Sequence, residues 1–236
     1  MNEMERWTLA KGYRLISNEE GFPPAYINRK DIAETFEFHD RNFFIIDECF
    51  GYMLSQTLAR IIKTRQPPID VLDVGGGTLS LAAREIAQRH PDTTRVINID
   101  VAISTNSQNT QNFHSLCEDA CKMSIHNNSI DLVYSWEMIP GLNKNRREQV
   151  LGEIARVLKP EGVALLGEED FCGLPSSDPQ LEQLSNSLSL SVLLKRGNFT
   201  KSVKVGNKYT NTNQFLMLMK PPIDPSIVAM TERNAA

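Results

Sequence analysis

Long apolar runs are missing from this sequence of 236 residues. A helix that spans a membrane needs about 18 or more consecutive apolar residues, and no stretch of the chain approaches that length. The first residues, MNEMERWTLAKGY, contain acids where a secretory signal peptide has a basic region followed by an apolar one. We therefore expect a soluble protein that stays in the cytoplasm and has no membrane partner.

Cysteine is also scarce, and the four cysteines are scattered: Cys49, Cys117, Cys121 and Cys172. They form no CxxC pair and have no histidine at zinc-finger spacing, so the sequence encodes neither a disulfide framework nor a metal site. An excess of positive charge is missing too, because the formal net charge is −4. Binding to nucleic acid normally requires a basic face, so we expect a small-molecule substrate and no nucleic-acid partner. The oligomeric state stays open, with a homodimer as one option.

The sequence does contain a clear change of pattern at Arg65-Gln-Pro-Pro68. Before it, apolar residues between Ile45 and Ile62 recur at steps of three to four, which predicts an amphipathic helix packed on the rest of the protein. The two prolines then end the helical pattern. We predict an N-terminal helical cap or lid over residues 1–66, a main domain over 67–222, and a C-terminal tail over 223–236 that need not be ordered.

Short apolar runs alternate with helical stretches in the main domain. The runs cover residues 71–74, 95–99, 132–135 and 163–166, and the helical stretches cover 79–89 and 146–158. This alternation predicts parallel βαβ units, and residues 201–209 and 214–219 are close enough for an antiparallel hairpin at one edge. The predicted fold class is α/β, a Rossmann-like three-layer α/β/α sandwich. Its seven-stranded sheet is mostly parallel with one antiparallel edge strand, and the N-terminal helical cap is added to it.

The segment VLDVGGGTLS, from Val71 to Ser80, is a predicted strand that runs through glycines into a helix. Glycines at such a junction let the backbone approach a ligand closely, and the free N–H groups at the helix start favour an anion. Asp100 ends the next apolar run, where an acid can accept hydrogen bonds from ribose hydroxyls. The fragments CEDA (117–120), SIDLVYS (129–135) and RVLKPEGVALL (156–166) follow in that order.

This series of fragments resembles the class I S-adenosylmethionine-dependent methyltransferases with a type 11/25-like domain, over approximately residues 69–170. The resemblance implies a methyltransferase that uses S-adenosyl-L-methionine as its cofactor. It implies a cofactor site made of Asp73, Gly75, Gly76 and Gly77 at the methionine part, Asp100 and Val101 at the ribose, Asp119 and Ala120 at the adenine, and Ser135 and Trp136 just past the fourth strand, near the methyl group. In the same family the acid at Asp73 helps to hold the cationic amino group.

Two positions depart from the family pattern. Leu79 stands where a third glycine is often found, which affects the expected path of the local backbone. The run Trp136-Glu137-Met138 is bulkier and more acidic than usual, and Glu137 either faces the methyl acceptor or begins a helix.

The resemblance implies in-line displacement at the methyl carbon, but the sequence names neither the acceptor nor a catalytic residue. A general base is needed only if the acceptor must lose a proton. Four residues of the expected pocket rim are candidates for that role: Glu137, Asp170, Tyr13 and His39.

Two alternatives remain at this stage. A nicotinamide-dependent oxidoreductase shares the strand, the glycine turn and the ribose acid. Its fingerprint, however, ends in Gly or Ala where this chain has Ser80, and it does not call for an acid at the position of Asp73. A non-catalytic module that binds S-adenosylmethionine and regulates another protein is the second alternative, because the motifs specify binding and not turnover.

Overall fold

The structure is a computed structural model of the chain. It describes residues 13–16, 25–28, 42–50, 52–104, 109–136, 138–139, 142–168, 187–195, 203–205, 208–210 and 214–222. The predicted tail over residues 223–236 and most of the predicted cap before residue 42 lie outside these ranges.

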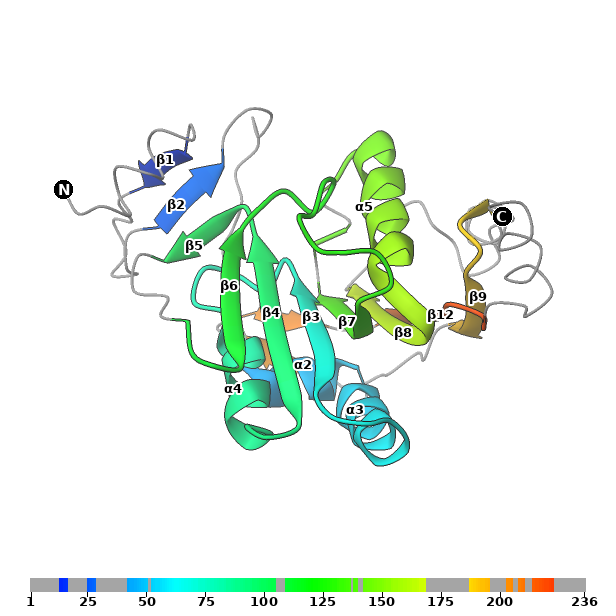
Figure 1. Cartoon of the computed structure of the whole chain (residues 1–236). Coiled ribbons are helices and arrows are strands. Elements are labelled where there is room, and N and C mark those ends of the chain that lie inside the picture. Colours follow the sequence, from blue (N-terminus) through cyan, green and yellow to red (C-terminus); the bar gives the residue numbers. More distant parts are fainter. Residues whose placement is uncertain are drawn as a thin grey trace, which may run out of the picture.

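A seven-stranded sheet lies at the centre of the protein, in the order β6-β4-β3-β7-β8-β12-β9 (Figure 1). Its strands are β3 (Ile69–Val74), β4 (Thr94–Asp100), β6 (Phe113–Cys117), β7 (Ile130–Trp136), β8 (Leu158–Glu168), β9 (Ser191–Lys195) and β12 (Gln214–Met219). The first five strands of the order pair in parallel, whereas β12 is antiparallel to both of its neighbours. The predicted fold class, a mostly parallel seven-stranded sheet with one reversed strand, is confirmed.

The reversed strand lies one place in from the edge, because β9 pairs with its outer side. The predicted hairpin of residues 201–209 with 214–219 is therefore wrong. β10 (Val203–Val205) and β11 (Lys208–Thr210) form a separate two-stranded sheet, since a connection of two residues favours their pairing with each other. β12 instead joins the main sheet, where Leu218 is 1% exposed and belongs to the core.

Helices cover both faces of the sheet and complete the three layers. The helices predicted over 79–89 and 146–158 are confirmed as α4 (Leu81–Arg89) and α5 (Lys144–Val157). α2 (Phe43–Cys49), α3 (Met53–Thr64) and α4 share one apolar core with the sheet, and α5 shares the core on the opposite face. The cores are built from residues such as Leu54, Leu58 and Ile86 on the first face, and Val150 and Ile154 on the second.

The apolar pattern between Ile45 and Ile62 forms two helices, α2 and α3, instead of the single helix predicted. At the corner, Tyr52 has a left-handed backbone with φ of 66°, and its N–H donates to the carbonyl of Asp47. The Asp47 side chain in turn accepts a hydrogen bond from the N–H of Ser55 at 2.8 Å. One buried acid thus closes the corner, and the apolar side of both helices still faces the sheet.

The chain before Arg65 contains strands as well as helices, which the sequence pattern did not predict. β1 (Tyr13–Ile16), β2 (Ala25–Asn28) and β5 (Ala102–Ser104) form an antiparallel sheet of three strands. β5 follows the end of β4 almost directly, so this small sheet lies beside the carboxyl end of β4 (Figure 1). Strands of three or four residues are too short to show a recognisable period.

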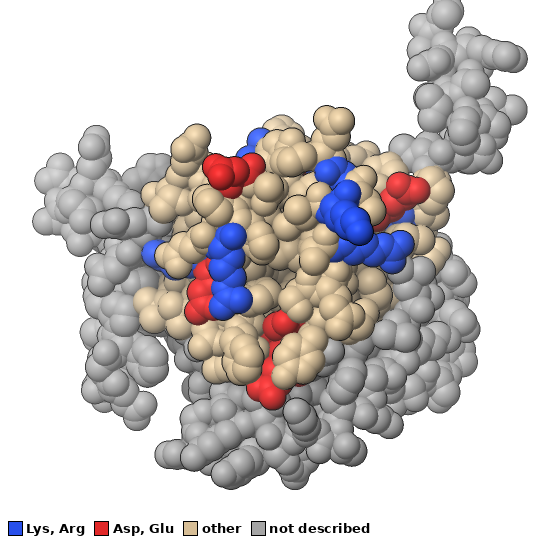
Figure 2. Space-filling view, turned by 90° about the horizontal axis from the view of Figure 1, so that it is seen from below, with Lys and Arg blue, Asp and Glu red and all other residues tan. Residues whose placement is uncertain are grey.

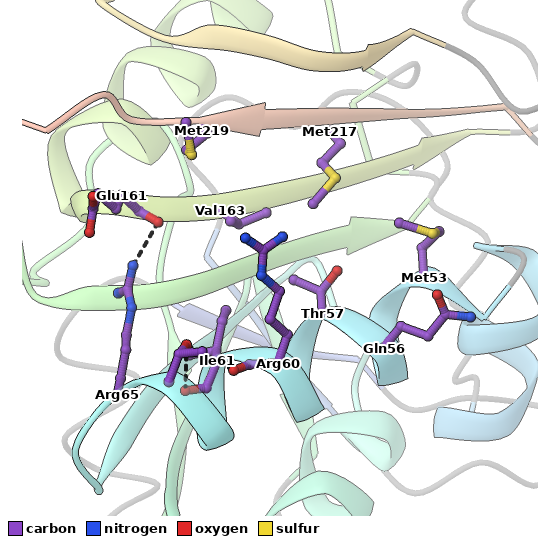
Figure 3. A pocket seen from close by; sticks show the side chains of 11 residues that line it. Met53, Gln56, Thr57, Arg60, Ile61, Arg65, Glu161, Val163, Met217 and Met219 are labelled. Atoms are coloured by element: carbon purple, nitrogen blue, oxygen red, sulfur yellow. Dashed lines mark hydrogen bonds between the residues drawn. The ribbon is translucent and has the colours of Figure 1, made fainter.

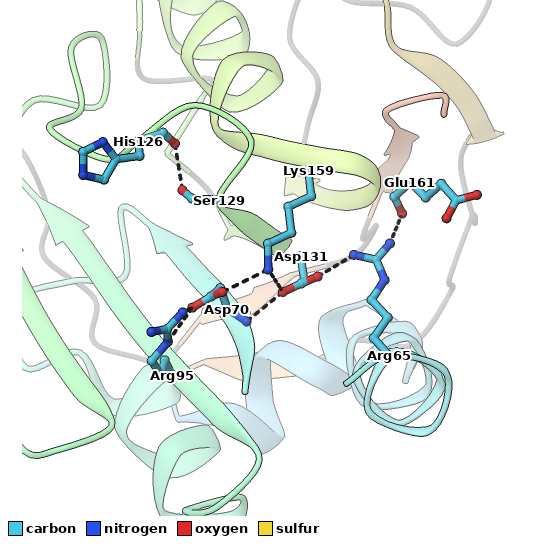
Figure 4. A network of polar contacts seen from close by, with 8 residues as sticks. All are labelled: Arg65, Asp70, Arg95, His126, Ser129, Asp131, Lys159 and Glu161. Carbon is cyan, nitrogen blue, oxygen red and sulfur yellow. Dashed lines mark hydrogen bonds and ion pairs between the residues drawn. The ribbon is translucent and has the colours of Figure 1, made fainter. Parts of the chain in front are cut away.

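An ion network ties together the amino ends of the central strands (Figure 4). Asp131, at the start of β7, accepts hydrogen bonds from the Asp70 N–H at 2.9 Å and from Lys159 Nζ at 2.7 Å, and it pairs with the Arg65 guanidinium. Burial alone would raise the pKa of Asp131, but the bonds from Lys159, the Asp70 N–H and Arg65 hold it below its usual value. Lys159 also donates to Asp70 at 3.0 Å, so the network joins β3, β7 and β8.

The molecular surface at this end carries charges of both signs. Figure 2 views the protein from below, and the acidic and basic side chains of the described residues are interspersed there. Among the described residues, this face therefore shows no extended area of a single charge.

Candidate functional site

Three neighbouring parallel strands end together at the opposite, carboxyl edge of the sheet. β3 ends at Val74, β4 at Asp100 and β6 at Cys117, and Asp100 and Cys117 are register partners. Neighbouring strands lie about 4.8 Å apart, so the segments that follow these three strands span roughly 10 Å. Ligands of open parallel sheets bind at this edge. The structure thus brings together the glycine turn, Asp100 and the segment around Asp119.

The turn after β3 uses backbone conformations that glycine adopts most easily. Gly75 has φ of 76° and Gly77 has φ of 83°. The Gly75 N–H donates to the carbonyl of Ile99 at 2.8 Å, and the Gly77 N–H donates to Oδ2 of Asp100 at 3.0 Å. These bonds fasten the turn to the end of β4, and α4 begins at Leu81 directly after it.

The Asp73 side chain lies beneath this turn, inside the sheet. It is 1% exposed, and its Oδ2 accepts a hydrogen bond from the Tyr134 hydroxyl at 2.8 Å. Burial and the adjacent Asp73 carboxylate raise the pKa of Tyr134 well above its usual value, so Tyr134 stays a hydrogen-bond donor. A Cβ on Gly76 would clash with Asp73, which means that the bare glycine lets the turn close over the acid. In this arrangement Asp73 supports the turn from below.

A buried polar cluster holds the start of α4 against β4 and β6. Asn98 Nδ2 donates to the Ser80 hydroxyl at 2.7 Å and to the Ser115 hydroxyl at 3.1 Å, and the two hydroxyl oxygens lie 3.0 Å apart. Asn98 Oδ1 lies beside Gly76 and has no hydrogen-bond partner among the described residues. Ser80 itself, the N-cap of α4, has a left-handed backbone with φ of 55°. The glycine turn is therefore fixed at both of its ends.

Asp100 is oriented by two backbone N–H groups. Its Oδ2 accepts from Gly77, as described above, and its Oδ1 accepts from Ala102 at 2.9 Å. Ala102 is the first residue of β5, so this carboxylate joins the glycine turn to the small N-terminal sheet. Val101, which the sequence also assigned to this site, lies between Asp100 and Ala102 in the chain and is half-buried.

A second carboxylate, that of Asp119, follows the end of β6. Its Oδ1 accepts from the Cys121 N–H at 2.9 Å, and Arg146 Nη2 lies 2.8 Å from both of its oxygens. Burial alone would raise the pKa of Asp119, but the Cys121 N–H and the Arg146 guanidinium hold it below its usual value, so the side chain is an ionised acceptor. The sequence indicated Asp119 but not Arg146, which lies 27 positions further on and belongs to no motif. Beside Asp119, the N–H of Ala120 has no acceptor among the described residues.

Ser135 and Trp136 are the last two residues of β7, so the prediction that they lie just past this strand is wrong. Ser135 is fully buried and Trp136 is 5% exposed. The Trp136 ring packs edge-on against Phe50, with centroids 5.3 Å apart, and it fills the space over Gly167, where a Cβ would clash with it. Because of this packing against β8, strand β7 continues to Trp136, one residue beyond the predicted apolar run of residues 132–135. Both side chains lie in the packed sheet.

Met138 contacts the glycine turn, although no sequence motif points to it. A Cβ built on Gly75 would lie only 2.6 Å from Met138 Cγ, so this side chain packs directly on the turn. An apolar residue in a loop carries no sequence signal for such a contact.

The candidates for a general base come from the N-terminal segment and from the segments after β7 and β8. Glu137, Asp170 and His39 lie outside the described residues, and Tyr13 belongs to β1, of which the structure describes the backbone. Within the described ranges, no group of three or more His, Cys, Asp and Glu side chains is arranged to hold a metal ion. The same ranges include no helix with the length and apolar character needed to cross a membrane.

A pocket of about 710 Å³ lies elsewhere, between α3 and the strands β8 and β12 (Figure 3). Arg60 points into it from α3, and Val163, Met217 and Met219 line the opposite wall. No residue of the glycine turn and neither Asp100 nor Asp119 lines this pocket.

Comparisons with known proteins identify a domain in this chain and structures that share its fold. Residues 72–166 match the family model described as a methyltransferase domain. Among solved structures, an S-adenosylmethionine-dependent methyltransferase from Methanosarcina mazei is 18% identical, with a TM-score of 0.50, and the match covers 69% of this chain and 97% of that one. A TehB-like S-adenosylmethionine-dependent methyltransferase from Corynebacterium glutamicum is 16% identical, with a TM-score of 0.50 and coverage of 74% and 99%.

A candidate sarcosine dimethylglycine methyltransferase from Galdieria sulphuraria is 18% identical, with a TM-score of 0.53 and coverage of 75% and 86%. At these identities the structures share the fold. A search of the curated proteins finds none that matches this chain.

Proposed function

We propose that this chain, whose residues 72–166 match a methyltransferase domain, is an S-adenosylmethionine-dependent methyltransferase of class I that methylates a small-molecule acceptor by in-line displacement. The observation that carries the proposal is the row of groups at the ends of β3, β4 and β6. That row combines a glycine turn of fixed shape with two carboxylates at the ends of the next two strands.

The dimensions and the chemistry of this row fit the cofactor. Asp119 offers an ionised acceptor and Ala120 a backbone donor, which suits the amino group and the adjacent ring nitrogen of adenine. Asp100 lies one strand nearer to the glycine turn, where its carboxylate suits the ribose hydroxyls. The turn from Gly75 to Gly77 then receives the methionine part. It can keep this shape because Gly76 has no side chain, which would push the turn away from Asp73.

We assign Asp73 an indirect role in this site. Because its carboxylate is buried and bonded to Tyr134, it supports the glycine turn and thereby the backbone that meets the methionine part. The side chains of Ser135 and Trp136 are buried. These two residues are therefore proposed to border the site through their backbone at the end of β7.

When bound, S-adenosylmethionine supplies a methyl group that is activated by the cationic sulfur. The protein must align an acceptor with that methyl group and exclude water, and such positioning can contribute on the order of 7–11 kcal/mol to lowering the barrier. Met138, which packs on Gly75, is proposed to exclude water beside the turn. Glu137, Asp170, Tyr13 and His39 stay candidates for a base that removes an acceptor proton.

A small acceptor is supported by the charge of the protein and by the position of the N-terminal cap. The net charge of −4 does not suit a nucleic-acid substrate. β2 pairs with β5 directly beside Asp100, so the part of the cap that contains β1 and β2 is proposed to border the acceptor side of the site. The end of α3 at Thr64 and the start of β3 at Ile69 support the proposed boundary near residue 67.

Calorimetric titration of the purified chain with S-adenosylhomocysteine, S-adenosylmethionine and NAD tests binding. We expect heat from the first two ligands and none from NAD. No heat from either sulfur nucleoside would contradict the proposal, whereas tight binding of NAD would favour the oxidoreductase alternative.

Incubation with methyl-labelled cofactor and a cell extract tests transfer. We expect label in the small-molecule fraction, while label in the protein or nucleic-acid fraction would contradict a small acceptor. Binding with no label in any fraction would favour the regulatory module. The variant Asp100→Asn, which should bind cofactor poorly, serves as the negative control.

A further inference from the structure

The contact between Arg146 and Asp119 joins two elements that are distant in sequence. Arg146 lies in the first turn of α5, and its N–H donates to the side chain of the N-cap residue Asn143 at 3.1 Å. This capping sets the start of the helix, so the guanidinium reaches back to Asp119, where Nη2 lies 2.8 Å from both oxygens. Cys121 Sγ also lies 3.7 Å from the Arg146 carbonyl oxygen, so the segment after β6 and α5 contact each other twice.

The pair is shielded from water but can still be reached by a ligand. The Arg146 side chain is 20% exposed and that of Asp119 is 33% exposed. A charged hydrogen bond in such a half-buried place is stronger than one on an open surface. Arg146 therefore holds the carboxylate in one orientation and keeps it ionised while leaving part of it accessible.

The hydrogen bonds decide which oxygen of Asp119 meets a ligand. Oδ1 accepts from both the Cys121 N–H and Arg146, whereas Oδ2 accepts from Arg146. A carboxylate oxygen has two acceptor positions, so Oδ2 is the oxygen that is left to accept from a ligand. With the Ala120 N–H, it forms an acceptor beside a donor. Adenine presents the complementary pair, an amino donor beside a ring-nitrogen acceptor, whereas hypoxanthine presents the reverse order.

We propose that Arg146 is a positioning residue that fixes Asp119 to accept from the adenine amino group, and that it thereby sets the preference of this chain for adenine over hypoxanthine nucleosides. The proposal rests on the proposed cofactor site. An ionised Asp119 held by Arg146 repels the carbonyl oxygen that hypoxanthine carries in place of the amino group. Without Arg146 the carboxylate loses a hydrogen bond to each of its oxygens and can turn away, so this repulsion weakens.

Two ligands and three variants test the proposal. The ligands are S-adenosylhomocysteine and its deaminated analogue S-inosylhomocysteine, titrated by calorimetry. Arg146→Met removes the donor and keeps much of the side-chain length, and Arg146→Lys keeps the charge. Lys122→Met is the matched control, because it removes one positive charge from the same segment while only the backbone N–H of Lys122 contacts Asp119.

We expect the wild type and Lys122→Met to prefer the adenine ligand strongly and equally. In Arg146→Met, affinity for S-adenosylhomocysteine should fall by about tenfold, and the preference over the inosine analogue should narrow by at least about tenfold, as expected for loss of a charge-assisted hydrogen bond. Arg146→Lys should recover part of the preference, and it keeps the test informative should Arg146→Met fail to fold.

A purely structural role for Arg146 would weaken both ligands equally and lower the melting temperature, and that result would overturn the proposal. So would an unchanged preference in both Arg146 variants. If the wild type binds neither ligand, the proposed function itself fails. If the wild type binds S-adenosylhomocysteine and the preference survives the loss of Arg146, only the inference about Arg146 fails.

Discussion

Tyr134 and Asp73 are register partners on the parallel strands β7 and β3, and the Tyr134 hydroxyl donates to Oδ2 of Asp73 at 2.8 Å. Both side chains are buried, and the glycine turn closes directly over the acid. The shape of the candidate binding turn therefore depends on a hydrogen bond inside the sheet, one layer below the surface that meets a ligand.

Replacing Tyr134 by Phe leaves a buried carboxylate without this donor. We expect Tyr134→Phe to lower the free energy of unfolding by about 1–3 kcal/mol and to weaken binding of S-adenosylhomocysteine. Urea unfolding and calorimetry measure the two effects. Tyr52→Phe, at a residue that is 42% exposed, is the control and should change stability by less than about 0.5 kcal/mol. Equal stability of the two variants would show that the buried bond contributes little.

Gly76 has no room for a side chain. We expect Gly76→Ala to destabilise the fold by about 1–3 kcal/mol, because the added methyl group clashes with Asp73 and Asn98. Thermal unfolding measures the change. Gly152→Ala on α5 is the matched control, since its Cβ would meet only Leu188 at 3.9 Å and alanine is favoured inside a helix by about 0.5–1 kcal/mol. A neutral effect at Gly76 would mean that the turn does not close over Asp73.

Asp100 accepts hydrogen bonds that hold the glycine turn in place, and by our proposal it also contacts the ribose. Asp100→Asn keeps the volume but replaces one oxygen by an amide group, which cannot accept from both Gly77 and Ala102. We expect the affinity for S-adenosylhomocysteine to fall by roughly 10- to 100-fold, equivalent to about 1.5–3 kcal/mol. Calorimetry checks this, with the exposed Asp92→Asn as the control for charge. An unchanged dissociation constant would place the ribose elsewhere.

The ion network predicts how stability depends on pH. The pKa of Asp131 is held below its usual value, so its ionised form stabilises the folded state at neutral pH, and this contribution is lost as pH falls through the lowered pKa. We expect Asp131→Asn to lose about 3 kcal/mol at pH 7. Its deficit relative to the wild type should shrink below about pH 4, the unfolded-state pKa of an aspartate.

Denaturant unfolding at a series of pH values measures this deficit. Glu148→Gln, an exposed change on α5, is the control and should show no such dependence. A deficit that stays constant with pH would rule out the ionised network as its source.

The central fold was predictable because its signals are local. The run from Val71 to Val74, the glycines after it and the helix up to Arg89 lie within about twenty positions, and the structure confirms the strand and the helix that they predict. Asp100 was predicted because it ends the apolar run that follows the glycine turn, and Asp119 was implied by the family resemblance of the fragment CEDA. The structure places both at the carboxyl edge.

The contacts that shape the site were not predictable, because they depend on side chains brought together by the sheet. Nothing near Asp73 in the sequence indicates Tyr134 as its partner, and nothing near Asp119 indicates Arg146. Trp136 continues β7 because Gly167 on the next strand makes room for its ring, a relation between neighbours in space. For the same reason, the pairing of β12 with β9 was missed in favour of a partner closer in sequence.

The network of Asp70, Asp131 and Lys159 secures β3, β7 and β8 at the end that lies away from the glycine turn. The alignment of these strands therefore does not depend on the residues around a bound ligand. Substitutions around the glycine turn should therefore change ligand binding while the register of these strands is kept at their other end.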